Sequence, residues 1–229
     1  MSTYITIDGG TTSTRVNFLK NKEILDTVKL NIGARVAIGN HETYTKAIKG
    51  AIDEIMLRNN ADKIERILAS GMITCEFGLC NLPHIKAPAG INELHNSMYE
   101  TTISEISDIP FVFIRGIKID SEDFASFDMM RGEETELMGI IRNDFGKCLY
   151  ILPGSHSKLI FTDEDGRITY FTTTLTGEMI YSLSTGTILK DAVDTYKEME
   201  ETMRSAIISA QRTSEEIIKN AQESIVDIS

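Results

Sequence analysis

The amino-acid sequence predicts an α/β fold with a mixed sheet, and two observations lead to this expectation. Residues 4–30 contain three short runs of β-branched and aromatic side chains separated by turn-forming residues, which is typical of an antiparallel meander. After this meander, a helical pattern alternates with short apolar runs along the chain. Alternating helices and strands pack in layers around a sheet, so an α/β layer is the expected architecture.

The elements of the first half follow from local patterns. Five strands are expected, at 4–7, 15–19, 23–30, 66–70 and 111–114. A helix is expected over 43–59, because apolar side chains from Ala47 to Met56 recur at steps of three and four residues. Asn59 and Asn60 should end this helix, since asparagine is common where a helix stops.

The middle of the chain repeats the theme. A helix is expected over 130–142, followed by strands at 147–152, 157–162 and 168–173, with an Asp-Gly hairpin turn at 165–166. Each meander has a glycine-containing turn near its first strand. The two meanders therefore look like duplicated half-domains that face one cleft.

Residues 191–229 differ from everything before them. This tail contains no glycine or proline, and its apolar side chains recur every three to four residues from Tyr196 to Ile225. Thr195 and Glu198 have the spacing of a capping box. The tail is therefore expected to form one long, acidic, amphipathic helix with a heptad-like seam.

Composition excludes several classes of protein. The chain has 229 residues with 34 Asp and Glu against 23 Lys and Arg, giving a formal net charge of −11. The acidic balance argues against electrostatic binding to nucleic acid, and no apolar run is long enough to span a membrane. The first residues lack the pattern of a signal peptide, so a cytoplasmic protein is expected. Cys75, Cys80 and Cys148 are expected to be free thiols, and no metal-site spacing is found.

Two turns carry residues that suit phosphate binding. Residues 8–13, Asp-Gly-Gly-Thr-Thr-Ser, lie between two expected strands, where glycines let backbone amides approach an anion and Asp8 could hold Mg²⁺ through water. Residues 154–158, Gly-Ser-His-Ser-Lys, occupy the same place in the second meander and add hydroxyls and a cation. Each turn alone could be an ordinary polar hairpin, and the pair together favours phosphate binding.

Two adjacent carboxylates, Glu133 and Glu134, stand beside Gly132 at the start of the second expected helix. The helix dipole stabilises a carboxylate at this position, which is an ordinary structural reason for glutamate. In the functional interpretation, one carboxylate accepts the proton of an alcohol that attacks phosphorus, while Arg131 binds an anionic group of the substrate. We choose Glu133 as the base.

Residues 70–78 follow an expected strand at the edge where α/β sheets expose ligand-binding loops. A plain strand-to-helix turn would have a similar sequence. Histidines add little, because only His156 lies in one of these motifs.

Together, these motifs resemble those of sugar and acid-sugar kinases of the actin/hexokinase/Hsp70 superfamily, and more narrowly those of the 2-dehydro-3-deoxygalactonokinase family. The resemblance covers roughly residues 1–190. The residues that carry it are 7–12 with Arg15, 70–72, 130–135, 152–158 and 175–179.

The resemblance implies a ribonuclease H-like, actin/hexokinase-type fold with duplicated domains, the second of them incomplete, followed by the long C-terminal helix. The implied domains are a sugar-binding and first phosphate domain at 1–143, a shortened second domain at 144–190 and the helical tail at 191–229. The implied reaction transfers phosphate from ATP, with Mg²⁺, to 2-dehydro-3-deoxy-D-galactonate and yields the 6-phosphate.

The resemblance also implies roles for single residues. Glu133 stands where related carbohydrate kinases keep a catalytic Asp, and Asp8 and Arg131 complete the expected catalytic set, with Asp8 holding the metal through water. The expected phosphate-binding residues are Gly9, Gly10, Thr11, Thr12, Ser13, Arg15, Gly154, Ser155, His156 and Lys158. The expected substrate-binding residues are Ser70, Gly71, Met72, Thr74, Gly78 and Ala89.

The chain departs from the family pattern in its last part. Family members continue with a glycine-rich adenosine-binding segment, which is not found at 191–229, and residues 196–229 instead resemble the coiled-coil region of DivIVA-like division proteins. Weak or absent turnover is therefore expected. One alternative is a non-catalytic kinase-like protein that self-associates through its tail, and another is a kinase of a different polyol or sugar acid.

Overall fold

The computed structural model describes residues 3–21, 23–61, 63–123, 126–141 and 146–188. The chain forms two compact units, of which the first runs up to Leu152 and includes Lys158–Thr173. The second contains Pro153–Ser157 and the chain from Thr174. The tail expected at 191–229 lies outside the described residues, and the expected domain boundaries at 143 and 190 stay predictions.

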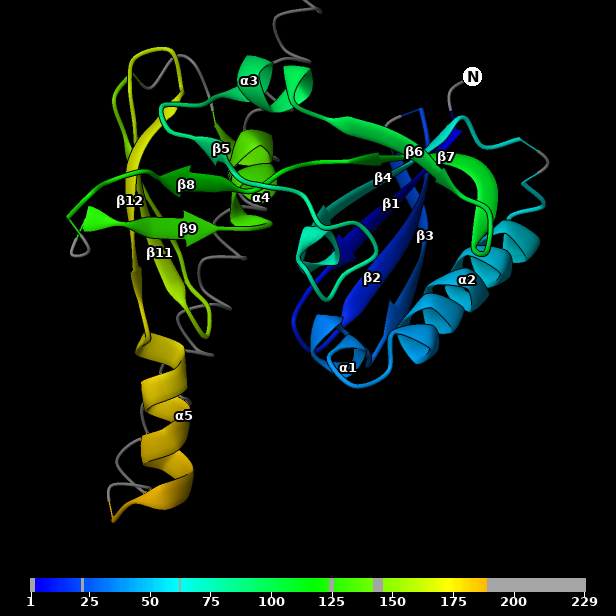
Figure 1. The fold of residues 1–229 in the computed structure, drawn as a ribbon, viewed down its shortest axis with the longest axis horizontal. Helices are drawn as coiled ribbons and strands as arrows, with labels where there is room; N and C mark the ends of the chain where they lie inside the picture. The colour runs from blue at the N-terminus through cyan, green and yellow to red at the C-terminus, as the bar shows by residue number, and fades with distance from the viewer. Residues whose placement is uncertain (1–2, 22, 62, 124–125, 142–145, 189–229) are drawn as a thin grey trace, which may run out of the picture. The chain divides into compact units, whose positions relative to one another are not determined.

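The first unit contains a mixed six-stranded sheet in the order β3-β2-β1-β4-β7-β6 (Figure 1). Its strands are β1 (Thr3–Gly9), β2 (Thr14–Lys20), β3 (Glu23–Leu30), β4 (Arg66–Gly71), β6 (Tyr99–Ile103) and β7 (Ser107–Phe113). Strands β1, β2 and β3 pair antiparallel, whereas β4 runs parallel to both β1 and β7. The predicted α/β fold with an N-terminal meander and a mixed sheet is confirmed.

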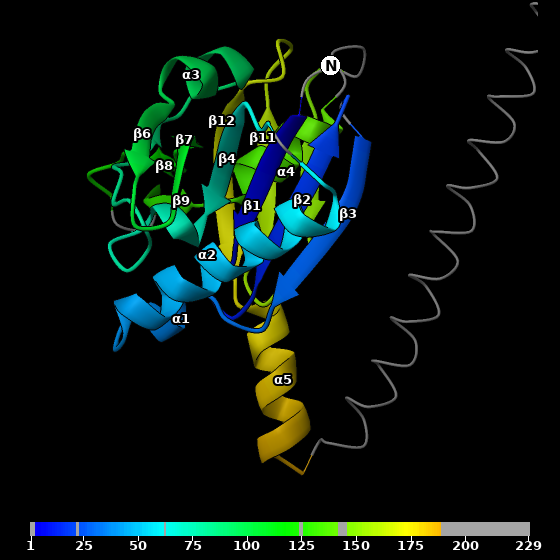
Figure 2. The same cartoon turned by 90° about the vertical axis from the view of Figure 1, so that its right-hand side faces the viewer.

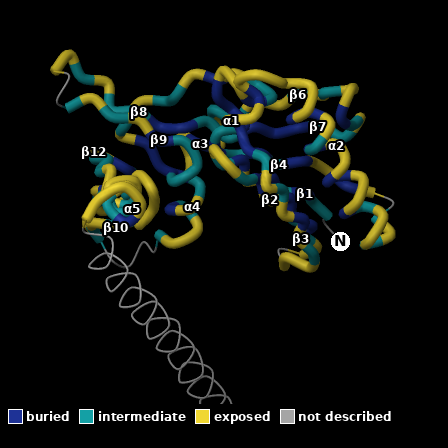
Figure 3. Tube along the Cα trace, turned by 90° about the horizontal axis from the view of Figure 1, so that it is seen from below, coloured by how far each residue is buried: buried dark blue, intermediate teal, exposed yellow. Residues whose placement is uncertain are grey.

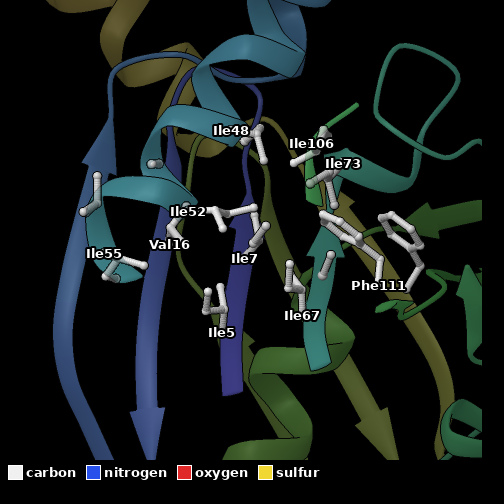
Figure 4. Packing of buried hydrophobic residues seen from close by; sticks show 14 of the residues in the cluster. Ile5, Ile7, Val16, Ile48, Ile52, Ile55, Ile67, Ile73, Ile106 and Phe111 are labelled. Carbon is white, nitrogen blue, oxygen red and sulfur yellow. The ribbon is translucent and has the colours of Figure 1, made fainter. Parts of the chain in front are cut away.

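Helix α2 (His41–Arg58) confirms the predicted first helix and lies across the meander (Figure 2). The Asn40 side chain caps it by accepting a hydrogen bond from the Thr43 backbone N–H at 3.0 Å. Its apolar side chains, including Ile48 and Ile52, pack on Ile7 and other buried residues of the sheet (Figure 4). This core holds the carboxyl ends of β1 and β4 in place.

A second core lies among shorter elements of the same unit. These are β5 (Ile85–Lys86), α3 (Ile91–Asn96), β8 (Ile117–Ile119), β9 (Asp128–Met130) and α4 (Glu133–Ile140), and they pack with β11 (Ser157–Thr162) and β12 (Ile168–Thr174). The buried side chains of this core are Ala89, Leu94, Ile117, Met130, Leu137, Ile160, Ile168 and Phe171. The helix predicted over 130–142 is wrong at its start, because Met130 pairs with Ile117 as part of β9, and the chain then turns at Gly132.

The second predicted meander is confirmed as an antiparallel sheet of β10 (Leu149–Leu152), β11 (Ser157–Thr162) and β12 (Ile168–Thr174). The predicted hairpin turn is also confirmed, since Gly166 has φ +73° and donates its N–H to the Asp163 carbonyl. Whether the two meanders are duplicated domains stays a prediction.

Three further short elements complete the described chain: α1 (Ala34–Ala37), the 3₁₀ turn η1 (Met72–Thr74) and α5 (Thr176–Gly186). Buried positions follow the central strands of the large sheet, whereas α5 is largely exposed (Figure 3). Among the described residues, no helix is long and apolar enough to cross a membrane.

Candidate functional site

The first predicted phosphate loop connects β1 to β2 and is held by backbone contacts. Its Gly10 N–H donates to the Ser13 carbonyl at 2.9 Å. From the far side, the N–H groups of Ala34 and Arg35 donate to the carbonyls of Gly10 and Thr11, each at 3.0 Å. The start of α1 therefore fixes the shape of the loop.

Gly33 permits this contact and was not singled out in the sequence analysis. A Cβ on Gly33 would lie 2.5 Å from the Gly10 carbonyl oxygen, so no larger residue fits without displacing the loop. In the sequence, Gly33 is an isolated glycine after a predicted strand. Such a glycine can allow two backbones to approach closely, but the sequence does not show which segment the second backbone belongs to.

Asp8 lies at the rim of this loop with an exposed carboxylate. It faces Arg15 across the β1–β2 pair, and the two form an ion pair at 3.6 Å. Thr11 and Thr12 are exposed beside it. One carboxylate near hydroxyl groups fits Mg²⁺, which takes oxygen ligands, uses one or two carboxylates and keeps several waters. Among the described residues, no group of three or more His, Cys, Asp or Glu side chains forms a metal site.

Three of the predicted motifs meet through their glycines. Gly9 and Gly71 end the parallel strands β1 and β4 in register, and a Cβ on Gly71 would lie 2.5 Å from the Gly9 carbonyl oxygen. Gly132, just before α4, also lies against Gly71 but less closely, since a Cβ there would lie 3.3 Å from the Gly71 Cα. The structure thus brings together the phosphate loop, the predicted substrate loop and the carboxylate pair.

The two adjacent carboxylates face different surroundings. Glu134 is fully buried, and its Oε1 and Oε2 accept hydrogen bonds from the Gly132 N–H at 2.8 and 2.9 Å. Glu133 is half-buried, and its Oε2 accepts a hydrogen bond from the Arg131 N–H at 3.0 Å. Glu133 therefore has the more accessible carboxylate, whereas Glu134 stabilises the turn that precedes the helix.

Burial raises the pKa of the Glu134 carboxyl from its ordinary value of 4.5 to about 8. The native state therefore holds this proton more tightly than the unfolded state, and the resulting stability is complete below pH 4.5 and is lost as the pH rises toward 8. We expect the free energy of unfolding to fall over this range by at most about 1.4 kcal/mol per pH unit from this group.

The Glu134→Gln variant should not show this fall, because glutamine does not titrate and its side-chain oxygen can still accept the Gly132 N–H. Urea unfolding of both proteins at several pH values between 5 and 8.5 tests the difference. Parallel curves would mean that Glu134 ionises normally in the native state.

The predicted substrate loop after β4 is compact. Thr74 is buried, and its hydroxyl donates to the Gly71 carbonyl at 2.9 Å. Gly78 is also buried, and a Cβ there would lie 2.1 Å from the Ile73 carbonyl oxygen. Ser70 and Met72 are half-buried beside them. Ser70, Gly71, Met72, Thr74 and Gly78 thus share one short segment, next to Gly9 and Gly132.

Ala89 lies elsewhere, in the second core. Its side chain is fully buried, and its backbone N–H and carbonyl both pair with Ile168. Its assignment to substrate binding stays a prediction.

Arg131 and Lys158 are bound to protein groups. Both Nη atoms of Arg131 donate to acceptors in the segment 74–84. Lys158 is buried, and its ammonium group donates to the Met129 carbonyl at 2.7 Å and to the Thr173 hydroxyl at 2.5 Å. The sequence could not distinguish these internal cations from ligand-binding ones, because both kinds stand beside glycine in polar motifs.

The rest of the second predicted phosphate loop lies in the second unit, where it meets the start of α5. Gly177 packs against Gly154, since a Cβ on Gly177 would lie 2.4 Å from the Gly154 carbonyl oxygen. The Glu178 N–H donates to the Ser155 carbonyl at 3.1 Å, and the His156 Nε2 lies 3.2 Å from the Glu178 carboxylate. Two of the motifs singled out in the sequence are therefore in contact here.

The remaining titratable groups include three thiols. Cys75 is buried, and Cys80 and Cys148 are half-buried. Burial raises the pKa of the Cys80 thiol, which makes it a weaker nucleophile at neutral pH.

Comparisons with known proteins point to one family. A family model described as 2-keto-3-deoxy-galactonokinase matches residues 8–223. A curated protein of Rhizobium meliloti (strain 1021), named as a 2-dehydro-3-deoxygalactonokinase, DgoK1, is 32% identical over 128 residues, which are 56% of this chain and 40% of that protein. A crystal structure described as a 2-dehydro-3-deoxygalactonokinase protein from Sinorhizobium meliloti is similar with a TM-score of 0.66 and 26% identity, covering 84% of this chain and 60% of the other.

The matches also show how much of each relative this chain spans and how much of this chain the family match covers. The chain spans less than two thirds of the length of either relative, 40% of one and 60% of the other. The family match continues to residue 223, so it covers more of the chain than the 190 residues expected from the motifs, and it includes most of the tail.

Proposed function

The chain belongs to the 2-keto-3-deoxy-galactonokinase family, and we propose that it transfers the γ-phosphate of ATP to the 6-hydroxyl group of 2-dehydro-3-deoxy-D-galactonate. The observation that carries this proposal is the meeting of three loops at Gly9, Gly71 and Gly132. Phosphoryl transfer needs a phosphate cradle, a site for the acceptor and a base close together. Loops suited to each of these tasks meet at this point.

Glu133 is the proposed base. As the 6-hydroxyl oxygen attacks phosphorus, its proton passes to the Glu133 carboxylate. The half-buried position of this side chain supports the assignment, and so does the hydrogen bond from the Arg131 N–H, which orients the carboxylate. Glu134 is unsuited to the role, because it is fully buried and bonded to Gly132.

The loop after β1 is the proposed phosphate cradle. The backbone around Gly9 and Gly10, with the hydroxyls of Thr11 and Thr12, would bind the transferred phosphate. Asp8 would hold Mg²⁺ through water, and the ion, when bound with ATP, neutralises charge on the phosphate oxygens.

Each unit, taken by itself, contains other proposed ligands. Ser70 and Met72 in the first unit would contact the sugar acid, whereas Thr74 is fully buried and its hydroxyl is bound to Gly71 and Arg131. Gly154, Ser155 and His156 are exposed in the second unit and are proposed phosphate ligands there. We do not assign Lys158 to phosphate, because its ammonium group is bound by Met129 and Thr173.

The purified 229-residue chain tests the proposal in an ADP-coupled assay with ATP, Mg²⁺ and 2-dehydro-3-deoxy-D-galactonate. We expect ADP release that is slow, as expected from the sequence, and that saturates with the sugar acid. Mass spectrometry should find a product that carries one phosphate group. Reactions without the sugar acid, with EDTA, or with the C4 epimer 2-dehydro-3-deoxy-D-gluconate are the controls.

The Asp8→Asn variant should lose activity without losing its fold, because Asp8 is exposed and lies at a loop rim. A chain that is folded by circular dichroism but releases no ADP in response to the sugar acid would contradict the proposed function.

A further inference from the structure

Arg131 stands in the turn between β9 and α4, directly before Gly132 and Glu133. Its guanidinium group is bound on one side only, by the segment that follows β4. Nη1 donates to the Thr74 carbonyl at 2.6 Å and to the Thr74 hydroxyl at 2.7 Å. Nη2 donates to the Leu82 carbonyl at 3.1 Å and lies 3.3 Å from His84 Nδ1.

These four contacts use all four hydrogens of the two Nη atoms. A bidentate grip on a carboxylate or phosphate uses two guanidinium N–H groups side by side, at least one of them on an Nη atom. Arg131 could bind an anion in this way only by releasing Thr74, Leu82 or His84. The arrangement therefore argues against the expected role of Arg131 as a ligand for an anionic group of the substrate.

Two of the residues that bind the Arg131 guanidinium group lie at the two ends of one loop. Thr74 and Leu82 stand at the two ends of residues 75–81, and the Leu82 N–H also donates to the Thr74 carbonyl at 3.1 Å. The two Nη atoms of Arg131 therefore connect the two ends of the predicted substrate loop. A flat group with donors in fixed directions suits this task, whereas a lysine ammonium group cannot reach both carbonyls in the same geometry.

The backbone of the same residue holds the proposed base. The Arg131 N–H donates to Glu133 Oε2 at 3.0 Å. Thr74, bound by the guanidinium group, in turn bonds the Gly71 carbonyl, and Gly71 contacts Gly132. A closed path of contacts therefore runs from the carboxylate through Arg131 to the substrate loop and back.

We propose that Arg131 is a positioning residue that locks the loop 74–84 to the turn carrying Glu133, so that acceptor and base are held in one geometry. The inference rests on the proposed kinase function for its catalytic consequence, and on the described contacts alone for the locked loop. The pKa of His84 reports on the position of Arg131 without an activity measurement. Burial and then the neighbouring Arg131 charge lower this pKa to about 4.

Two variants test the proposal against a ligand role. In Arg131→Lys the charge remains but the fork is lost, and we expect kcat to fall about 100-fold, the loss that a small misplacement of reacting groups can cause. The KM for ATP should stay unchanged. Arg58→Lys is the matched control, since Arg58 lies on the exposed side of α2 and should leave kcat as it is. A rise in the KM for the sugar acid with unchanged kcat would overturn the proposal, because it is the result expected of a substrate ligand.

A second set of measurements does not depend on activity. In Arg131→Met, amide hydrogen exchange across 75–82 should become faster than in the wild-type protein, while exchange in α2 stays the same. The pKa of His84, followed by NMR, should rise from its low value because a nearby positive charge is gone.

These measurements distinguish failure of the proposed role of Arg131 from failure of the proposed kinase function. If the wild-type chain shows no kinase activity but the loop is released in Arg131→Met, the lock is supported and the kinase function is not. If exchange across 75–82 and the His84 titration are the same in the variant as in the wild-type protein, Arg131 does not hold the loop and the proposal is wrong.

Discussion

Replacement of Glu133 by glutamine is expected to lower kcat by about 10²–10⁴-fold, the usual contribution of a general base. Glutamine keeps the length of the side chain, and its amide oxygen can still accept the Arg131 N–H, but it cannot take up the proton of the sugar hydroxyl. Steady-state kinetics with ATP and the sugar acid would measure the effect. Because the lost interaction exists only in the transition state, kcat and kcat/KM should fall together.

The control for this variant is Glu136→Gln. Glu136 is exposed in the first turn of the same helix, so its substitution removes a similar charge without touching the three loops. Thermal unfolding of both variants checks that the fold is kept. If Glu133→Gln retains wild-type turnover in a chain that phosphorylates the sugar acid, Glu133 is not the base.

Substitution of Gly71 by alanine is expected to destabilise the first unit by roughly 2–5 kcal/mol. Two costs combine, because φ +84° and ψ −153° lie where L-residues are strained, and because a Cβ there would lie 2.5 Å from the Gly9 carbonyl oxygen. A loss of this size is a large share of the stability of an ordinary domain. Urea unfolding followed by circular dichroism would measure it.

Gly50→Ala is the matched control for this substitution. Gly50 is exposed within α2, and a Cβ there would have no atom within 4 Å. Alanine forms helix better than glycine, so this variant should gain about 0.5–1 kcal/mol. Equal unfolding free energies for the two variants would show that the contact between the ends of β1 and β4 is not as tight as described.

Local periodicity was sufficient for the long elements. The expected strands at 4–7, 15–19 and 23–30 are β1, β2 and β3, and the helix expected at 43–59 is α2, at His41–Arg58. Alternation of period two and apolar spacing of three and four are properties of a single segment, so they can be recognised without knowing its neighbours.

Short elements were missed for the opposite reason. β5 has two residues, and β8 and β9 have three each, too few for any period to show. Their extended form comes from pairing with one another. The same cause explains the wrong start of the helix predicted at 130–142, because Met130 is assigned to a strand only once its pairing with Ile117 of β8 is known.

For the candidate site too, part of the result follows from the sequence and part only from the tertiary structure. The sequence by itself determined which residue types could do the chemistry: an aspartate and glycines in the first loop, and two glutamates after a glycine. It determined the family resemblance too, which the match over residues 8–223 confirms.

Only the tertiary structure decided which polar side chains are buried or hydrogen-bonded within the protein and so do not face a ligand. Glu134 is fully buried, Lys158 is bound to Met129 and Thr173, and Arg131 bridges Thr74 and Leu82, although all three stand in motifs beside Glu133 or Gly154. The physical reason is that the burial of these side chains, and the hydrogen-bond partners of Lys158 and Arg131, come from segments distant in the sequence. A motif specifies a side chain's chemistry, and the packing of distant segments decides whether that chemistry faces a ligand or the protein.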